Sequence, residues 1–325
     1  MKQVSALVVA ATTMLASTFP QAALADAVGK RVAYVTTSTR QPFISATAST
    51  IEREGTARGM KITVLTAGYD SAVQDQLVND VIAQKYDFLA LLTVDGQTII
   101  PALTRAKAAG IPVVLVNNPV PDGNEALYVS YVGEDRVELG RVIARSLIDA
   151  LKDRPRGRTA ILSGTMTDLT PARIIQGFKE AVATVPKVQL VAIEDARWDM
   201  AMSERAAGQL FARNTAQGGL DAIVGMADNM THGAIQAAKA ADIVVGTAPG
   251  KLINIGGSCM KFGMDHLRTG AQYSTMTVIP TRTGKAVVDV IEAHFNGKSV
   301  PKFTLLPIEE ITSANMEKYT QACTF

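Results

Sequence analysis

The sequence predicts an α/β protein, in which parallel strands are covered by helices. From Arg31 onward, short runs rich in β-branched residues alternate with longer segments whose apolar residues recur at helical spacing. This alternation restarts after a polar break at residues 152–158, which indicates a second unit of the same kind. The length of 325 residues also exceeds what one hydrophobic core usually supports, so two domains are expected.

The first 25 residues have the pattern of a secretory signal peptide. Lys2 precedes an apolar run over residues 4–15, and small residues end the segment at Ala25. The run is too short to cross a bilayer, and no cysteine follows Ala25 to accept a lipid. We therefore expect cleavage after Ala25 and a protein that is free in a bacterial periplasm.

The first unit is predicted to contain five strands and three helices. Gly59 and Gly110 follow the first and third helices, as glycine commonly does at a helix end. The predicted strands cover residues 32–36, 62–66, 88–92, 113–116 and 128–132, and the predicted helices cover residues 43–58, 72–84 and 98–109.

The second unit continues the same alternation to the end of the chain. Pro280 opens its last helix, since proline is favoured at the first helical position. The predicted helices cover residues 137–151, 173–184, 200–213, 230–240 and 280–294. The predicted strands cover residues 159–162, 188–193, 222–226, 252–255, 273–278 and a last segment near 303–308.

Charge and motif content argue against several function classes. The chain carries 32 basic and 30 acidic residues, so nucleic acid is not an expected partner. Residues 297–299 read Gly-Lys-Ser, but Glu292 stands where a phosphate-binding loop needs its first glycine. His232, His266 and His294 lie too far apart in sequence to predict a metal site, and we interpret them as surface or packing residues.

Cys259 and Cys323 are the only two cysteines of the chain. Export to an oxidising compartment allows them to pair and so to tie down the last residues, and two buried free thiols are the alternative. Cys259 follows Ser258 in a run that lacks the spacing of a hydrolase nucleophile and has no His–acid pair nearby. The sequence therefore predicts neither an enzyme nor a cofactor.

Residues 31–44 read RVAYVTTSTRQPFI, a strand, a polar loop and a helix that opens with Pro-Phe. This segment resembles the periplasmic sugar-binding proteins of the ribose-binding family. In that family the loop faces a cleft between two lobes, and the aromatic residue after the proline stacks on the sugar. Phe43 holds that place here, with Thr37, Arg40 and Gln41 before it.

Further segments resemble the same family in the same order along the chain. They are Gly110–Asn118, Ala172–Phe178, Arg197–Asp199, Ala227–Ala234 and Gly256–Gly270. The resemblance implies the type I periplasmic binding protein fold, with two doubly wound, Rossmann-like parallel-sheet lobes and a three-segment hinge. It implies crossings near Gly133, Val278 and Ile308. The N-terminal lobe would comprise residues 26–133 and 279–307, and the C-terminal lobe residues 134–278 and 308–325.

A sugar needs flat apolar rings against its faces and planar hydrogen-bonding groups around its rim. Phe43 and Trp198 are the candidate rings, with core packing and a surface position as their alternatives. Asn117 and Asn118 follow a strand and offer two carboxamides, unless they only form a turn before Pro119. Because loops at the carboxyl ends of parallel strands converge, these residues are expected in one cleft.

The chain also departs from the family pattern. Asn117 and Asn118 replace an Asp-Arg pair, and Ser258 stands where the family has an Asp. Arg173 is one position out of register with the family's arginine. Inside the cleft it would favour a ligand that carries a carboxylate or a densely hydroxylated polyol. The alternative is a solvated arginine in the first turn of a helix. The predicted ligand-binding residues are Thr37, Arg40, Gln41, Phe43, Thr93, Asn117, Asn118, Thr170, Arg173, Trp198, Asp228 and Ser258.

The resemblance implies the substrate-binding protein of an ABC importer, a monomer that captures a sugar or polyol and delivers it to an inner-membrane permease by closing its hinge. A periplasmic sensory receptor for the same ligands is the alternative. The ligand-binding half of a transcription regulator shares this fold but carries no signal peptide. A periplasmic enzyme would need an acid, base or nucleophile arrangement that the sequence does not show.

Overall fold

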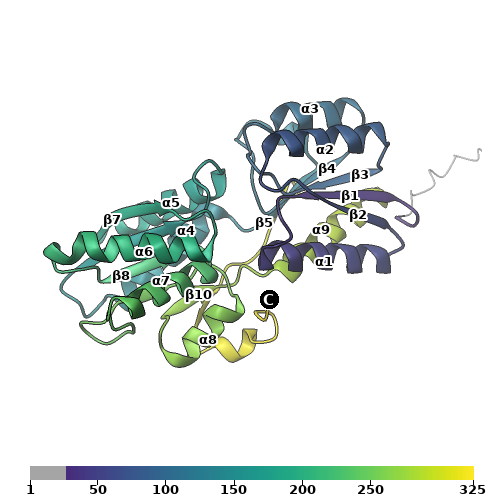
Figure 1. Cartoon of the computed structure of the whole chain (residues 1–325). Helices are drawn as coiled ribbons and strands as arrows, with labels where there is room; N and C mark the ends of the chain where they lie inside the picture. The colour runs from purple at the N-terminus through teal and green to yellow at the C-terminus, as the bar shows by residue number, and fades with distance from the viewer. Residues whose placement is uncertain (1–26) are drawn as a thin grey trace, which may run out of the picture.

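The computed structural model describes residues 27–325, which form two lobes, each built around a six-stranded sheet (Figure 1). The first sheet has the strand order β11-β5-β4-β3-β1-β2 and the second the order β12-β10-β9-β8-β6-β7. The predicted signal peptide lies outside the described residues. Among the described helices, none has the length and apolar character needed to span a membrane.

The first lobe is a parallel sheet with helices on both faces. Along strand β1, Val32 and Tyr34 pack on one face while Ala33 and Val35 pack on the other, so both faces belong to buried clusters. Helices α1 and α9 cover one face, and helices α2 and α3 cover the opposite face (Figure 1). The elements are β1 Arg31–Thr36, α1 Pro42–Ala57, β2 Lys61–Thr66, α2 Ser71–Ala83, β3 Phe88–Leu91, α3 Ile100–Ala108, β4 Val113–Val116, η1 Glu125–Leu127, β5 Ser130–Gly133, α9 Pro280–Phe295 and β11 Phe303–Leu305.

The second lobe repeats this arrangement, except that strand β12 runs antiparallel to β10 at one edge. Its largest buried side chains include Phe178, Leu139 and Leu147, which come from the two helices α4 and α5. The elements are α4 Arg136–Ala150, β6 Gly157–Ser163, α5 Leu169–Val182, β7 Val188–Asp195, α6 Met200–Asn214, η2 Thr215–Gln217, β8 Ala222–Gly225, α7 Asp228–Ala240, β9 Ile253–Ile255, α8 Lys261–Thr269, β10 Ser274–Met276, β12 Glu310–Thr312 and η3 Met316–Tyr319.

Aspartate side chains begin four of the helices. Asp70, Asp135, Asp168 and Asp199 each accept hydrogen bonds from backbone N–H groups in the first turn of α2, α4, α5 and α6. In a parallel α/β unit, such a helix start follows the carboxyl end of a strand. The caps therefore fix the loops at the edge of each sheet where a ligand site is expected.

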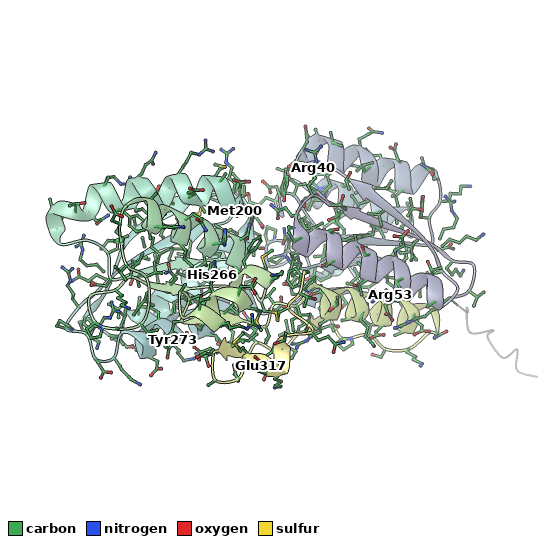
Figure 2. All side chains as sticks on the ribbon, turned by 60° about the horizontal axis from the view of Figure 1, so that its bottom comes forward. Arg40, Arg53, Met200, His266, Tyr273 and Glu317 are labelled. Atoms are coloured by element: carbon green, nitrogen blue, oxygen red, sulfur yellow. A yellow bond between two sulfur atoms is a disulfide. The ribbon has the colours of Figure 1, made fainter. Side chains whose placement is uncertain are left out.

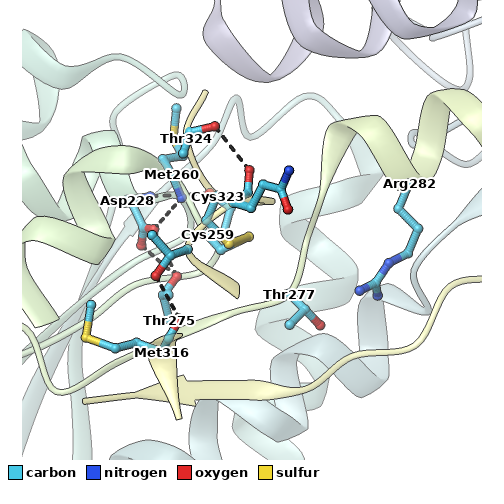
Figure 3. The surroundings of a disulfide bond; sticks show 12 residues. Asp228, Cys259, Met260, Thr275, Thr277, Arg282, Met316, Cys323 and Thr324 are labelled. Carbon is cyan, nitrogen blue, oxygen red and sulfur yellow. Dashed lines mark hydrogen bonds between the residues drawn. A yellow bond between two sulfur atoms is a disulfide. The ribbon is translucent and has the colours of Figure 1, made fainter. Parts of the chain in front are cut away.

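The chain passes between the two sheets three times, and these crossings are bonded to one another. Leu306 N donates to Gly133 O at 3.0 Å, which joins the third crossing to the first. Glu309 N donates to Thr277 Oγ1 at 2.8 Å, and Arg282 Nη1 donates to Pro307 O at 3.1 Å, which join the second to the third. Thr277 and Arg282 are labelled beside these segments in Figure 3.

Two elements in the C-terminal part of the chain differ from the prediction. The strand predicted near 303–308 ends at Leu305, because the chain there leaves the first sheet, and β12 in the second sheet follows it. Helix α8 was not predicted at all. It has nine residues between loops that contain glycine, so its apolar positions Met264 and Leu267 give too short a helical pattern to recognise.

Candidate functional site

A cavity of about 610 Å³ lies between the lobes at the carboxyl ends of the strands. Both lobes contribute to its wall: Phe43 and Asn118 come from the first, and Trp198 and Ser258 from the second. Nine of the residues singled out from the sequence line it, namely Thr37, Gln41, Phe43, Thr93, Asn117, Asn118, Thr170, Trp198 and Ser258.

Three of the predicted residues do not line the cavity. Arg40 is exposed on the loop after β1, and Figure 2 shows it on the first lobe at the end that faces Met200 of the second lobe. Arg173 Nη2 donates to Asp122 Oδ1 at 2.7 Å, an ion pair that joins the lobes at the protein surface. Asp228 is fully buried below the cavity wall.

The aromatic side chains lie on opposite lobes. Phe43, in the first turn of α1, contacts the buried clusters of both lobes and packs edge-on against Phe325, with 6.2 Å between ring centroids. Trp198 packs against Gly164, where an added Cβ would fall 1.9 Å from the indole ring. Asn229 Nδ2 donates to Trp198 O at 2.8 Å and so fixes the turn that carries the indole.

The backbone is strained around the cavity. Tyr69, Asn117, Arg197 and Trp198 have φ values between 51° and 67°, the left-handed region that residues other than glycine seldom adopt. All four line the cavity. Strain of this kind persists only where surrounding contacts hold it, and it is concentrated at binding sites in many proteins.

A hydrogen-bond network joins the two lobes at the cavity wall. Asn118 Nδ2 donates to Thr93 O at 2.9 Å in its own lobe and to Asp168 Oδ2 at 3.2 Å in the other. Thr170 Oγ1 donates to Asn118 Oδ1 at 3.4 Å. Burial raises the pKa of Asp168 to about 6, against the lowering effects of its bond to Thr170 and of the Arg136 guanidinium.

Two threonine hydroxyls at the cavity lack partners. Thr37 Oγ1 and Thr93 Oγ1 are buried, line the cavity and make no hydrogen bond to the rest of residues 27–325. A buried polar group costs about 1–3 kcal/mol when unpaired. A ligand hydroxyl or an ordered water would remove that cost.

A polar cluster around Asp228, whose backbone N–H donates to Ser258 Oγ at 3.4 Å, supports the wall. Figure 3 shows Asp228 with Met260 and Thr275. Both carboxylate oxygens of Asp228 accept from Thr275 Oγ1, and Oδ2 accepts from Met260 N at 2.8 Å. Burial raises the pKa of Asp228 to about 7, although these hydrogen bonds lower it. Cys259 forms a disulfide with Cys323, so the prediction of pairing is confirmed.

Several lining residues were not found from the sequence. Tyr69, Asp95, Arg136, Asp168 and Arg197 line the cavity but were not among the predicted ligand-binding residues. Only Asp168 carried a usable signal, because an Asp before an apolar helical pattern predicts a helix cap at the edge of the sheet. Within the described part of the chain, no three His, Cys, Asp or Glu side chains are grouped as metal ligands would be.

The comparisons with known proteins agree with this architecture. Residues 32–299 match the family model described as "Periplasmic binding protein domain". The ribose import binding protein RbsB of Bacillus subtilis (strain 168) is 27% identical over 272 residues, 82% of each chain. The galactofuranose-binding protein YtfQ of Escherichia coli (strain K12) is 24% identical over 267 residues, 80% of this chain and 81% of that one.

Solved structures show the same fold. A crystal structure of a galactofuranose binding protein has a TM-score of 0.84 at 18% identity and covers 90% of this chain and 97% of that one. A Mycobacterium smegmatis protein in complex with β-D-fucofuranose has a TM-score of 0.82 at 20% identity, with coverage of 90% and 94%. The two-lobed fold predicted from the sequence is therefore confirmed.

Proposed function

The chain belongs to the periplasmic binding protein domain family, and on that premise we propose that it captures a sugar or sugar-like polyol for an ABC importer. The ligand occupies the cavity between the lobes, and hinge closure delivers it to an inner-membrane permease. We propose a periplasmic location, with the signal peptide removed, and a monomeric state. The sensory alternative is not favoured, since relatives such as RbsB are named as import binding proteins.

The observation that carries this proposal is the combination of groups at the cavity. Phe43 and Trp198 offer apolar ring faces from opposite lobes, while Asn117 and Asn118 offer amide groups beside them. The unpaired hydroxyls of Thr37 and Thr93 suit hydroxyl groups on a ligand. These are the two kinds of surface that a sugar presents, C–H faces and a hydroxyl rim.

The charges at the cavity favour a neutral ligand over a sugar acid. Arg173, the candidate partner for a carboxylate, is paired with Asp122 outside the cavity. Arg136 lines the wall, but its guanidinium faces the buried Glu134 carboxylate at 3.3 Å. The other charged lining residues are Asp95, Asp168, Asp195 and Arg197, so carboxylates outnumber the remaining cation and disfavour an anion.

The hinge is proposed to be the three bonded crossings near Gly133, Val278 and Ile308. In this proposal the lobes comprise residues 26–133 with 279–307, and residues 134–278 with 308–325. Closure brings Phe43 and Trp198 onto the two sides of one ligand. A permease that recognises only the closed shape then receives only loaded protein.

Calorimetric titration of the mature protein tests this function. The protein is unfolded and refolded with its disulfide intact to remove bound ligand, and then titrated with D-ribose, D-allose, D-fucose, myo-inositol, D-glucosamine and D-glucuronate. We expect saturable binding of a neutral member of this panel, accompanied by a change in Trp198 emission. Binding of none of them by correctly folded protein would argue against a sugar receptor, and preferred binding of D-glucuronate would contradict the assignment of a neutral ligand.

A further inference from the structure

A buried ion pair lies at the first crossing, beside the cavity. Arg136 is the first residue of α4, and its Nη1 lies 3.3 Å from Glu134 Oε2. The Glu134 side chain is 0% exposed and that of Arg136 is 4% exposed. Burial costs each ion several kcal/mol, and such pairs often contribute little net stability.

The Arg136 guanidinium holds Asn117 across the two lobes. Its Nε and Nη2 donate to Asn117 O at 3.3 and 2.9 Å, and Nη2 also donates to Asn117 Oδ1. Tyr131 Oη donates to the same Asn117 carbonyl at 3.0 Å. Asn117 has φ of 64°, a strained conformation that these bonds to both its backbone and its side chain maintain.

The bonds extend from Asn117 along the cavity wall. Asn117 Nδ2 donates to Asn118 Oδ1 at 3.0 Å, so the orientation of one carboxamide fixes that of the next. The guanidinium therefore fixes Asn117 directly and Asn118 through Asn117. Replacement of Arg136 by glutamine removes the paired guanidinium donors, so the carboxamides of Asn117 and Asn118 would both be released.

Glu134 connects the same guanidinium to the hinge. Its carboxylate oxygens make no hydrogen bond within residues 27–325, and the charges that act on it are those of Arg136 and Arg282. Arg282, in the first turn of α9 just after the second crossing, donates to Pro307 O at the third. Gly133, the residue before Glu134, leaves no room for a Cβ, which would lie 2.6 Å from Tyr131 Oη.

We propose that Arg136 is a positioning residue, which locks Asn117 and Asn118 on the cavity wall and anchors that wall, through Glu134, to the first hinge crossing. The proposal rests on the proposed function, in which Asn117 and Asn118 contact the ligand. The contacts of Arg136 with Asn117 and Glu134 lie at the crossing itself and not at the cavity mouth. The wall therefore keeps its geometry while the lobes open. Loss of the guanidinium then loosens both the wall and the relative orientation of the lobes.

Distances between two spin labels in ligand-free protein test the hinge part of this proposal. The labels are attached to cysteines introduced at Ala83, the last residue of α2, and Lys239 on α7, which are both exposed. The native cysteines are not labelled, since they form a disulfide. We expect Arg136→Gln to broaden the distance distribution at least about twofold relative to the parent.

The matched control is Arg145→Gln in the same helix. Arg145 also pairs with a glutamate, Glu138, at 2.6 Å, but its side chain is 57% exposed. This variant should reproduce the parent distribution, because an exposed pair carries no contact between the lobes. Equal widths for the parent, Arg136→Gln and Arg145→Gln would overturn the proposal.

A double variant separates positioning from stability. Arg136→Met with Glu134→Leu removes both buried charges, so it should recover the thermal stability that Arg136→Gln loses. It should nevertheless keep the broad distance distribution. Hydrogen exchange at the Asn117 side-chain amide should also be faster, because the carboxamide is no longer held through its Oδ1 by the guanidinium. Recovery of the narrow distribution would show that Arg136 is only structural. No ligand is present, so this result is independent of whether the sugar titration succeeds.

Discussion

At the scale of single residues, the site depends on backbone conformations that require particular neighbours. The consecutive left-handed residues Arg197 and Trp198 place the indole against the cavity, and they do so because Asn229 binds the Trp198 carbonyl and because Gly164 has no side chain. The resemblance to sugar-binding proteins identified Trp198 as an aromatic candidate. It gave no indication of Gly164, whose role exists only once the turn folds over it.

Substitution of Gly164 tests this dependence. Gly164→Ala introduces a Cβ that would overlap the indole, so Trp198 must move and the affinity for the ligand should fall about tenfold, or 1.4 kcal/mol. Trp198 emission should shift in the free protein. The control is Gly208→Ala, because an added Cβ there meets no atom within 4 Å and alanine favours the α6 helix. An unchanged affinity in Gly164→Ala would contradict the stacking role of Trp198.

The buried Asp228 predicts a dependence of stability on pH. Its folded pKa of about 7 lies above the usual value of 3.8, so the folded state holds its proton more tightly than the unfolded state. The stability that this group contributes is complete below pH 4 and is lost as the pH rises through 7. Between pH 6.5 and 8.5, where His residues are mostly neutral, the free energy of unfolding should fall by about 1 kcal/mol.

Urea unfolding at these two pH values measures the effect. Asp228→Asn lacks the titrating group, so its free energy of unfolding should change less over the same interval, even though it is lower overall. Asp168→Asn is the comparison, since the pKa of Asp168, about 6, places most of its titration below this interval. A parent protein whose stability is constant from pH 6.5 to 8.5 would rule out a raised Asp228 pKa.

At the scale of helices and strands, the parts that repeat a pattern were predictable and the parts that depend on tertiary contacts were not. Strand β4, Val113–Val116, is a continuous buried apolar run and matches the predicted residues. The division of the last predicted strand between two sheets depends on where the chain crosses between the lobes, which no local pattern records.

The same distinction applies to the site. The loops that follow strands were predictable, because the carboxyl ends of parallel strands always meet at one edge. The direction in which a loop side chain points was not: Ser258 lines the cavity, whereas Asp228 turns below it to bind Thr275 and the Met260 N–H. That choice follows from the hydrogen bonds available in the core, and these come from residues distant in sequence.

The loop before α8 depends on the disulfide. Cys259 lies between Ser258 and Met260, which both line the cavity, and Cys323 secures the C-terminal tail against it. Removal of the bond by Cys259→Ala with Cys323→Ala should lower the free energy of unfolding by about 2–4 kcal/mol and weaken ligand binding. Unfolding by urea with and without reductant measures the first effect. The double variant should not respond to reductant; a parent that is equally stable in both conditions would contradict the prediction.

At the scale of the whole molecule, the ligand should act as a bridge between lobes. Phe43 packs against the buried clusters of both lobes, and Asn118 binds Asp168 across the cavity. These contacts, together with the crossings, join the lobes of the ligand-free protein. A ligand enclosed by both walls adds contacts that exist only in the folded, closed protein.

Calorimetry of thermal unfolding tests this bridging. At a ligand concentration about one hundred times Kd, the free energy of unfolding should rise by about 2.7 kcal/mol, and both lobes should unfold in one transition. Phe43→Ala at the same ligand concentration should show a smaller rise, because one ring face is missing. Two transitions of which only one responds to ligand would show that the ligand contacts a single lobe.

The C-terminus has a practical consequence for work with this protein. The chain ends between the lobes (Figure 1), where the Phe325 carbonyl accepts from Lys261 N at 3.2 Å and its ring meets Phe43. A purification tag or fluorescent reporter fused after Phe325 would thus begin at the rim of the binding cavity. Fusions placed ahead of residue 27 avoid that crowding, whereas a reporter fused after Phe325 would be well placed to respond optically to sugar.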